Sequence, residues 1–336
     1  MTTPPVAGEP PLLEVRDLHV EFRTREGIAR AVNGANYTLR PGETLAVLGE
    51  SGSGKSVTAQ AIMGILDTPP GFVTGGEVLF KGDDLLKLGD DGRRALRGES
   101  IAMVFQDALS SLNPVFPVGW QIAELFRIHR GMRKKEAMNE ALQALERVRI
   151  PGAKERIGDY PHQFSGGMRQ RVMVAMAIAL HPEILIADEP TTALDVTVQA
   201  QILELMADLQ REDNMGLILI THDLGVVAEV ADKVAVMYAG RIVEQASIEE
   251  MFASPAHPYT VGLMESIPSL ESKAGELKAI KGLPPSLVAL PPGCSFAPRC
   301  PLAFDRCWQE VPEPVEVGPG RTSRCFIAEE VRDGKR

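Results

Sequence analysis

The sequence predicts an α/β fold in which helices cover both faces of a parallel sheet. From Arg169, a helix pattern reaches Leu180, and short apolar runs at 184–187, 217–220 and 234–238 then alternate with further helix patterns. Strands that alternate with helices are typical of a parallel sheet. A glycine-rich loop between an apolar strand and a helix pattern indicates the same architecture. The length of 336 residues allows one large α/β domain with an appended module, or two domains.

The composition is that of an ordinary globular chain, with 44% hydrophobic and 24% charged residues. A formal net charge of −10 argues against nucleic-acid binding through the whole surface. The longest apolar run, 172–180, is too short to span a bilayer, and the first residues lack the pattern of a signal peptide. We therefore expect a cytosolic chain without a nucleic-acid partner, in which four cysteines bind metal or stay free.

The N-terminal part has the pattern of an antiparallel β subdomain that follows a flexible, Pro-rich segment at 1–11. Turn residues at Gly27, Asn33-Gly34 and Pro41-Gly42 separate four short β-like runs, namely 12–15, 20–22, 37–39 and 44–48. A helix pattern at 56–66 follows, and two further strands are expected at 76–80 and 101–105.

The region from about 107 to 163 is predicted to be a helical subdomain. Its clearest signal is an apolar stripe spaced by four, three and three residues, which indicates a helix face packed on the core: Met138, Leu142, Leu145 and Val148. Beyond residue 250 the chain is Pro-rich and loses periodicity. We therefore expect a main domain at 12–250 and an irregular, cysteine-containing extension at 251–336.

The most specific motif is G-E-S-G-S-G-K-S at 49–56, which lies between an apolar strand and a helix pattern. Its glycines let backbone N–H groups converge on phosphate oxygens, and the helix N-terminus adds a positive dipole. Lys55 neutralises the β- and γ-phosphates, and the Ser56 hydroxyl completes a Mg²⁺ shell. We expect ATP and Mg²⁺ here, bound by Gly49, Glu50, Ser51, Gly52, Ser53, Gly54, Lys55, Ser56 and Val57.

Acidic and polar side chains follow three of the predicted strands. Asp188 and Glu189 end the apolar run at 184–187, where Asp188 suits Mg²⁺ and Glu189 is placed to orient or deprotonate the attacking water. Gln106 and His222 end two other strands, where they could contact the γ-phosphate, Gln106 also reaching Mg²⁺ and water. Each of these last two residues, taken alone, is more often structural than catalytic.

A second glycine motif, Ser165-Gly166-Gly167, opens the helix pattern at Met168 and forms another anion-binding helix terminus. One chain cannot easily place two such loops on one nucleotide. The sequence therefore suggests an ATP shared between two subunits, although Ser165 alone is also more often structural.

Taken in order, these motifs resemble the ATP-binding subunit of an ABC transporter over residues 12–245. The matching elements are the phosphate loop, Gln106, the signature 164–168, Asp188-Glu189, the D-loop Ala193-Leu194-Asp195 and His222. The resemblance implies a P-loop NTPase fold of the ABC type, with Glu189 as general base, His222 as γ-phosphate switch and Asp195 communicating across a dimer. The signature departs from the commonest form, L-S-G-G-Q, at Phe164 and Met168; because Ser165, Gly166 and Gly167 remain, phosphate binding is expected to persist.

A finer resemblance is to the oligopeptide/dipeptide-importer branch, which includes nickel and glutathione importers. It depends on the stretches Gln106–Pro114, Ser165–Arg171 and His257–Thr260. The branch implies import of di- or oligopeptides, with nickel or glutathione as alternatives. The implied partners are a paralogous ATPase, two transmembrane permease subunits and an extracytoplasmic binding protein, which places the chain peripherally on the cytoplasmic face of the membrane.

An adenine-stacking aromatic residue is expected upstream of the phosphate loop. Phe22 is the best candidate, although an ordinary core phenylalanine is at least as consistent with the pattern, and Arg30 lies near the expected position of the base.

The four cysteines, Cys294, Cys300, Cys307 and Cys325, have the spacing C-x5-C-x6-C-x17-C. The absence of a tight C-x2–4-C knuckle weakens a zinc interpretation, while four thiolates can hold an iron–sulfur cluster. Chemistry alone leaves an iron–sulfur cluster, zinc and free thiols open. The resemblance to the peptide-importer extension implies a structural 4Fe–4S cluster.

Rival interpretations are a soluble ABC ATPase that acts on ribosomes or DNA, a regulatory module with a degenerate ATP site, and an exporter ATPase. The chain has neither a second ATPase unit nor a long coiled-coil insertion, which argues against the first. Lys55, Asp188, Glu189 and His222 argue against the second. Only the branch-level stretches argue against the third.

Overall fold

The computed structural model describes residues 10–106, 111–192, 194–266 and 280–335, so most of the segment predicted to be flexible lies outside the described residues. The chain forms two units. The first contains residues 40–43 and 88–220, and the second contains residues 10–39, 44–87 and those from Thr221 onward. Among the described helices, none combines the length and the apolar character needed to cross a membrane.

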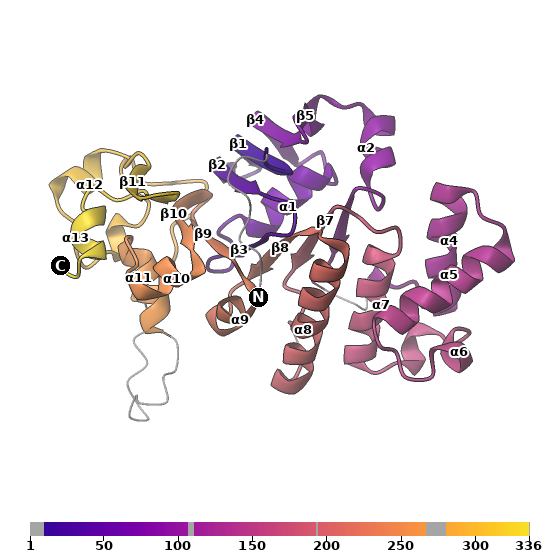
Figure 1. Ribbon diagram of the computed structural model, residues 1–336. Coiled ribbons are helices and arrows are strands. Elements are labelled where there is room, and N and C mark those ends of the chain that lie inside the picture. Colours follow the sequence, from indigo (N-terminus) through magenta and orange to yellow (C-terminus); the bar gives the residue numbers. More distant parts are fainter. Residues whose placement is uncertain (1–9, 107–110, 193, 267–279, 336) are drawn as a thin grey trace. The chain divides into compact units, whose positions relative to one another are not determined.

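The second unit begins with an antiparallel sheet of strand order β2-β1-β4-β5 (Figure 1). Its strands, and the short 3-10 helix that follows them, are β1 (Leu13–Thr24), β2 (Gly27–Leu39), β4 (Gly71–Phe80), β5 (Asp83–Asp84) and η1 (Leu85–Lys87).

The predicted runs at 12–15 and 20–22 are therefore parts of one strand. The turn predicted at Asn33-Gly34 is wrong, because Gly34 lies inside β2. It has φ +84° and lies near Asp17, where the β1–β2 pairing shifts register. Such a bulge uses the same residue types as a turn.

A second set of strands in this unit has the order β11-β12-β10-β9-β3. β3 pairs with β9 in parallel, whereas the remaining pairs are antiparallel. These strands and the associated helices are β3 (Thr44–Leu48), α1 (Lys55–Met63), α9 (Leu224–Val230), β9 (Lys233–Tyr238), β10 (Arg241–Ser247), β11 (Val315–Gly318) and β12 (Arg321–Ser323). Every residue of β3 is buried, which explains its continuous apolar sequence.

The C-terminal extension is more ordered than the sequence predicts. Its helices are short: α10 (Ile248–Ala253), α11 (Pro258–Glu265), η3 (Ala297–Arg299), α12 (Asp305–Gln309) and α13 (Ala328–Arg332). The β11–β12 hairpin pairs with β10, and Glu244 lies opposite Ser323. Tyr259 and Phe296 of the extension join a buried cluster that also contains Tyr238 of β9. The extension therefore shares a core with the strand next to β3.

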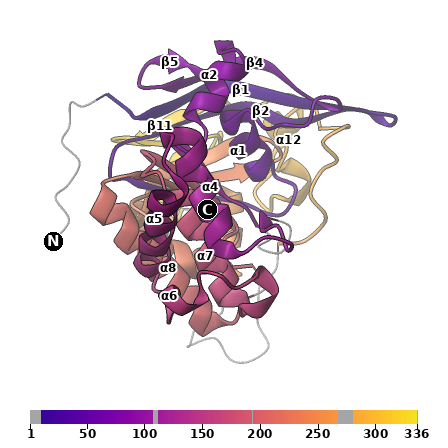
Figure 2. The same cartoon turned by 90° about the vertical axis from the view of Figure 1, so that its right-hand side faces the viewer.

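The first unit contains the parallel strand order β8-β7-β6. Its strands and helices are α2 (Asp90–Leu96), β6 (Ile101–Val104), α4 (Val118–Arg130), α5 (Lys134–Arg147), α6 (Ala153–Arg156), η2 (Pro161–Gln163), α7 (Gly166–Ile178), β7 (Ile184–Asp188), α8 (Val196–Asp213) and β8 (Gly216–Thr221). Both views show α4, α5, α6 and α7 grouped together (Figures 1 and 2). The parallel strands and the helical region agree with the sequence prediction.

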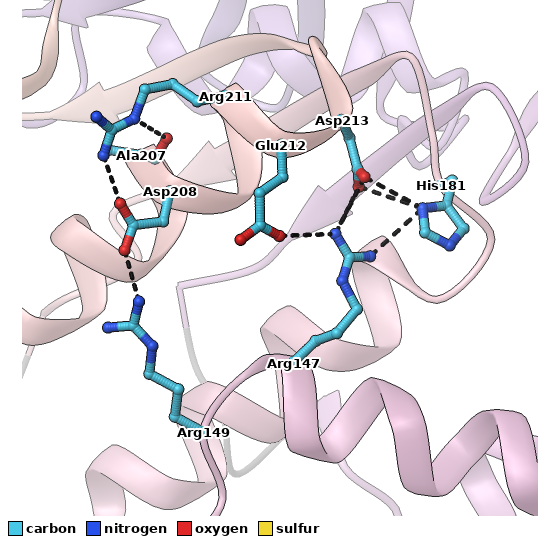
Figure 3. Close-up of polar contacts among 8 residues, drawn as sticks. All are labelled: Arg147, Arg149, His181, Ala207, Asp208, Arg211, Glu212 and Asp213. Carbon is cyan, nitrogen blue, oxygen red and sulfur yellow. Dashed lines mark hydrogen bonds and ion pairs between the residues drawn. The ribbon is translucent and has the colours of Figure 1, made fainter.

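Charged side chains connect the end of α5 with the end of α8 (Figure 3). Arg147 Nη2 donates to both carboxylate oxygens of Asp213 at 3.0 Å and to Glu212 at 3.4 Å. The Nδ1 atom of His181, a residue that precedes β7, lies 3.3 Å from Asp213 Oδ1. Similarly, Arg149 Nη2 donates to Asp208 Oδ2 of α8 at 2.6 Å. This ion-pair network links the helical region to α8.

Candidate functional site

The phosphate loop adopts a backbone that only glycine tolerates at two positions. Gly49 has φ +154° and Gly54 has φ +109°. A Cβ atom on Gly49 would overlap with the carbonyl oxygen of Met237, and one on Gly54 would overlap with that of Ala31. Both obstacles are backbone atoms, which cannot rotate away as a side chain can. The two glycines therefore let the loop pass close to β2 and β9.

Lys55 lies folded back over this loop. Its buried ammonium group donates to the carbonyl oxygens of Gly49, at 2.7 Å, and Glu50, at 3.1 Å. The loop is also held by the Gly240 amide, which donates to the Ser53 carbonyl at 2.8 Å. The Ser53 hydroxyl is buried and has no hydrogen-bond partner among the described residues. A lysine, an unpartnered hydroxyl and a glycine-rich backbone suit the oxygens of a phosphate group.

The carboxyl end of β7 places Asp188 in the buried interior and Glu189 at its edge. Glu189 has φ +45°, a left-handed conformation that is uncommon for a residue other than glycine. Gln106 Nε2 donates to Glu189 Oε2 at 3.0 Å, and Thr192 Oγ1 donates to the same oxygen at 3.0 Å. The structure thus brings two predicted residues together and adds Thr192. The Thr-Thr pair just after Pro190 was the available sequence signal for that third residue.

The signature segment lies beside the start of α8. The Ser165 hydroxyl caps α7 by accepting from the Met168 amide at 3.4 Å, and Asp195 caps α8 by accepting from the Val198 amide at 3.0 Å. A Cβ atom on Gly167 would come within 2.6 Å of Val198 Cγ1. Gly167 therefore permits the close packing that places the signature near Asp195. Residue 193 of the D-loop lies outside the described residues, as do residues 107–110 after Gln106.

Arg156 contacts both positions at which the signature departs from its commonest form. Its guanidinium lies 4.9 Å from the centroid of the buried Phe164 ring, and its Nη1 lies 3.4 Å from Met168 Sδ. Asp159 pairs with the same arginine at 3.2 Å. Sequence reasoning missed Arg156, because a charged residue on a short helix carries no periodic signal.

The remaining nucleotide candidates lie in the second unit. His222 is exposed and follows β8, and its neighbour Asp223 caps α9. Phe22 lies half-buried in β1 and pairs with Ala29 of β2, and Arg30 is exposed in β2. Their roles at a nucleotide stay predictions.

The four cysteines all border one small cavity of about 20 Å³. They are half-buried free thiols, and burial raises the pKa of Cys300 to about 11 and that of Cys325 to about 12. No group of three or more His, Cys, Asp or Glu among the described residues is arranged to hold a metal ion. The cavity has about the volume of one water molecule. The described residues therefore form no ready metal site, and the predicted iron–sulfur cluster stays a prediction.

Comparison with known proteins agrees with these features. Residues 32–192 match the ABC transporter family, and residues 243–307 match the C-terminal region of oligopeptide/dipeptide transporters. The chain is 52% identical to the oligopeptide transport ATP-binding protein OppD of Salmonella typhimurium, covering 94% of this chain and 93% of that protein. The chain belongs to the oligopeptide/dipeptide branch of the ABC transporter family. It is 50% identical to the dipeptide transport ATP-binding protein DppD of Bacillus subtilis, with 95% of each chain covered.

Solved ABC cassettes have the same fold as this ABC ATPase. The ATP-binding cassette MJ0796, in a dimeric post-hydrolysis state with ADP and Pi, superposes with a TM-score of 0.63 and 27% identity over 70% of this chain and 98% of that one. The cassette cbiO1 of Clostridium perfringens, part of the transporter complex cbiONQ, gives a TM-score of 0.62 and 30% identity over 73% and 92% of the two chains. The predicted P-loop NTPase fold of the ABC type is confirmed.

Proposed function

We propose that this ABC ATPase hydrolyses ATP to energise the uptake of di- or oligopeptides across the cytoplasmic membrane. The observation that carries the proposal is the placement of Glu189 at the end of β7, where Gln106 and Thr192 both donate to one carboxylate oxygen. Two donors hold that carboxylate in one orientation, as a base that must meet a water molecule requires. The assignment to peptides comes from relatives whose names state oligopeptide or dipeptide transport.

At the phosphate loop, Lys55 neutralises the charge of the β- and γ-phosphates, and the loop amides donate to phosphate oxygens. The Ser56 hydroxyl, the Asp188 carboxylate and the Gln106 side-chain oxygen would hold Mg²⁺. These are the hard oxygen donors that this ion prefers. The metal would neutralise charge that develops on the transferred phosphate.

Glu189 accepts a proton from the attacking water, and His222 donates a hydrogen bond to the γ-phosphate. Ser165, Gly166, Gly167 and Met168 form a helix N-terminus suited to the γ-phosphate of an ATP held by the other ATPase subunit. Asp195, next to that helix terminus, communicates between the two ATP sites. Phe22 and Arg30 are proposed to contact the adenine.

The proposed assembly contains a second ABC ATPase, a paralogue of this chain, and two transmembrane permease subunits. An extracytoplasmic peptide-binding protein delivers the solute, and the chain lies peripherally on the cytoplasmic face of the membrane. An affinity pull-down from gently solubilised native membranes, read by mass spectrometry, tests this. Two permeases and a second ATPase support the proposal. Ribosomal or DNA-repair proteins without permeases would overturn the transport role and leave the ATPase chemistry intact.

The variant Glu189→Gln tests the chemical role. It keeps the size and one acceptor oxygen of the side chain but removes the base, so ATP binding should persist while hydrolysis falls by about 10² or more. The matched control is Thr192→Val, which removes one donor to the carboxylate and leaves the base in place. It should lower turnover much less. Near-normal hydrolysis by Glu189→Gln would remove Glu189 from the mechanism.

For the extension, we propose a structural 4Fe–4S cluster held by Cys294, Cys300, Cys307 and Cys325. Its support is that all four thiols border one cavity, whose lining also includes His257. Anaerobic purification followed by iron, sulfide and zinc analysis tests it. About four irons per chain with visible absorbance support the cluster. Zinc, or metal-free thiols, would refute it.

A further inference from the structure

Glu50, the second residue of the phosphate loop, is held by the C-terminal extension. Arg299 donates to both of its carboxylate oxygens, from Nη1 to Oε2 at 2.6 Å and from Nη2 to Oε1 at 2.9 Å. The Arg299 side chain is only 4% exposed, and that of Glu50 is 29% exposed. A bidentate, largely buried pair of this kind fixes distance and orientation together.

Arg299 is itself fixed by residues of the extension and by Tyr238 of β9. Its Nε donates to the Lys281 carbonyl at 3.2 Å, its Nη1 to the Tyr238 hydroxyl at 3.3 Å and its Nη2 to the Ile280 carbonyl at 3.5 Å. Every nitrogen of the guanidinium thus has a partner outside the loop. Because its rotamer is already restricted, Arg299 holds Glu50 with little further loss of entropy. The Glu50 carboxylate in turn raises the pKa of Arg299, which keeps the arginine charged.

The backbone of Glu50 is held by the same part of the chain. Its amide donates to the hydroxyl of Tyr259 at 2.9 Å. Tyr259 is fully buried, with its ring 4.6 Å from that of Tyr238 and 5.4 Å from that of Phe296. The remaining polar group of Glu50, its carbonyl, accepts from Lys55. The acceptor of the phosphate-binding lysine is thereby connected to the extension.

Charge gives this contact a second consequence. A carboxylate in a loop that binds a triphosphate repels the ligand unless a cation neutralises it. Arg299 supplies that cation from a position 249 residues along the chain. It contacts the loop at Glu50 and acts on ATP through this residue.

We propose that Arg299, together with Tyr259, is a positioning residue for the phosphate loop, so that the C-terminal extension sets the ATP affinity of this subunit. The extension preorganises the loop by fixing Glu50 at both its carboxylate and its amide, and preorganisation strengthens binding without a new ligand contact. The residues concerned belong to the motifs H-P-Y-T at 257–260 and A-P-R-C at 297–300.

The test measures ATP hydrolysis and binding of a fluorescent ATP analogue by the full-length chain carrying Arg299→Gln. We expect the KM for ATP and the Kd for the analogue to rise about tenfold, with kcat changed less than about twofold. Glu50→Gln should raise the KM less, because it removes the repelling charge along with the contact. The double variant should therefore bind ATP more tightly than Arg299→Gln alone.

The matched control is Arg321→Gln. Arg321 makes another buried ion pair, in which its Nη2 lies 3.2 Å from Glu244 Oε1. The side chain of Arg321 is 3% exposed and that of Glu244 is 0% exposed. Neither residue belongs to the phosphate loop. The variant Arg321→Gln should lower the thermal midpoint of unfolding and leave the KM for ATP unchanged. If Arg299→Gln does not fold, Arg299→Lys retains the charge but not the bidentate contact and should give an intermediate KM.

A merely structural role for Arg299 predicts a different result. Arg299→Gln would then lower the thermal midpoint as Arg321→Gln does and leave the KM for ATP unchanged, and the double variant would bind ATP no more tightly than Arg299→Gln does. Either observation would overturn the proposal. Both leave the assignment of Glu189 as base untouched, because that assignment depends on kcat.

Discussion

Lowering the pH from about 7.5 to about 5.5 should destabilise the C-terminal extension through His257. This side chain is 2% exposed and its Nδ1 accepts from the Tyr259 amide at 3.0 Å, which caps α11. Burial lowers its pKa from 6.5 to about 3, although a hydrogen bond with the Arg324 backbone acts in the opposite direction. Glu244, paired with Arg321, accepts from the His257 amide at 2.9 Å. His257 is therefore neutral in the folded chain.

The magnitude follows from the two pKa values. In the unfolded chain the imidazole takes up a proton below its ordinary pKa of 6.5, whereas in the folded chain it does so only near pH 3. The contribution of the neutral His257 to the free energy of unfolding is thus fully present above pH 6.5. It decreases as the pH falls from 6.5 toward 3. At pH 5.5, protonation of the imidazole in the unfolded chain raises the unfolding equilibrium constant by a factor of about 11. This factor equals a decrease of about 1.4 kcal/mol in the free energy of unfolding.

The assay is urea unfolding of the wild type and of His257→Asn at both pH values. Asparagine keeps a side-chain acceptor for the Tyr259 amide but does not titrate. The variant should be less stable at neutral pH because it fills less volume, and it should lose about 1.4 kcal/mol less than the wild type on acidification. Equal losses in the two proteins would refute the assignment of a neutral, buried His257.

Three other changes test the described contacts. Asp213→Asn should cost about 1 kcal/mol of unfolding free energy by urea titration, and adding Arg147→Gln should cost little more, because the two share one ion pair. Gly167→Ala should cost about 1 to 3 kcal/mol in the same assay, and Val198→Ala should partly rescue it by removing the obstructing methyl group. Gly54→Ala should weaken ATP binding about tenfold or more in a nucleotide titration, since the loop must leave its φ of +109°. Additive losses for Asp213→Asn and Arg147→Gln would contradict the shared ion pair. A Gly167→Ala chain that Val198→Ala does not rescue would contradict the steric argument, and unchanged ATP affinity of Gly54→Ala would contradict the backbone argument.

The phosphate loop and the acidic end of β7 could be predicted because their chemistry is local. In each, consecutive residues define a strand, a turn and the polar groups that follow it, as at 44–56 and 184–189. The apolar stripe of α5 was a weaker guide. Leu145 is buried as predicted, but Leu142 is half-buried, and the most buried positions include Ala137 and Ala141. Small residues permit close helix packing, and hydrophobic periodicity underestimates them.

The contacts that could not be predicted join charged or polar residues far apart in sequence. Arg156 and Met168 are 12 residues apart, and Arg299 and Glu50 are 249 residues apart. Arginine occurs on many surfaces, so its type and spacing do not indicate whether it is buried against a carboxylate. The Arg299–Glu50 pair becomes visible only when the buried aromatic cluster of the extension, with Tyr259 and Phe296, is placed against β9.

The identity of residue 50 has a physical reason that the motif G-x-x-x-x-G-K-[ST] does not contain. The motif leaves this position free, and a negative residue there is unfavourable beside a triphosphate. With Arg299 in place, the carboxylate becomes an attachment point, because the pair is bidentate and largely buried. A subunit that lost its extension while keeping Glu50 would bind ATP less tightly than one that lost both. The acidic residue in the loop and the arginine in the extension are therefore expected to be functional only together.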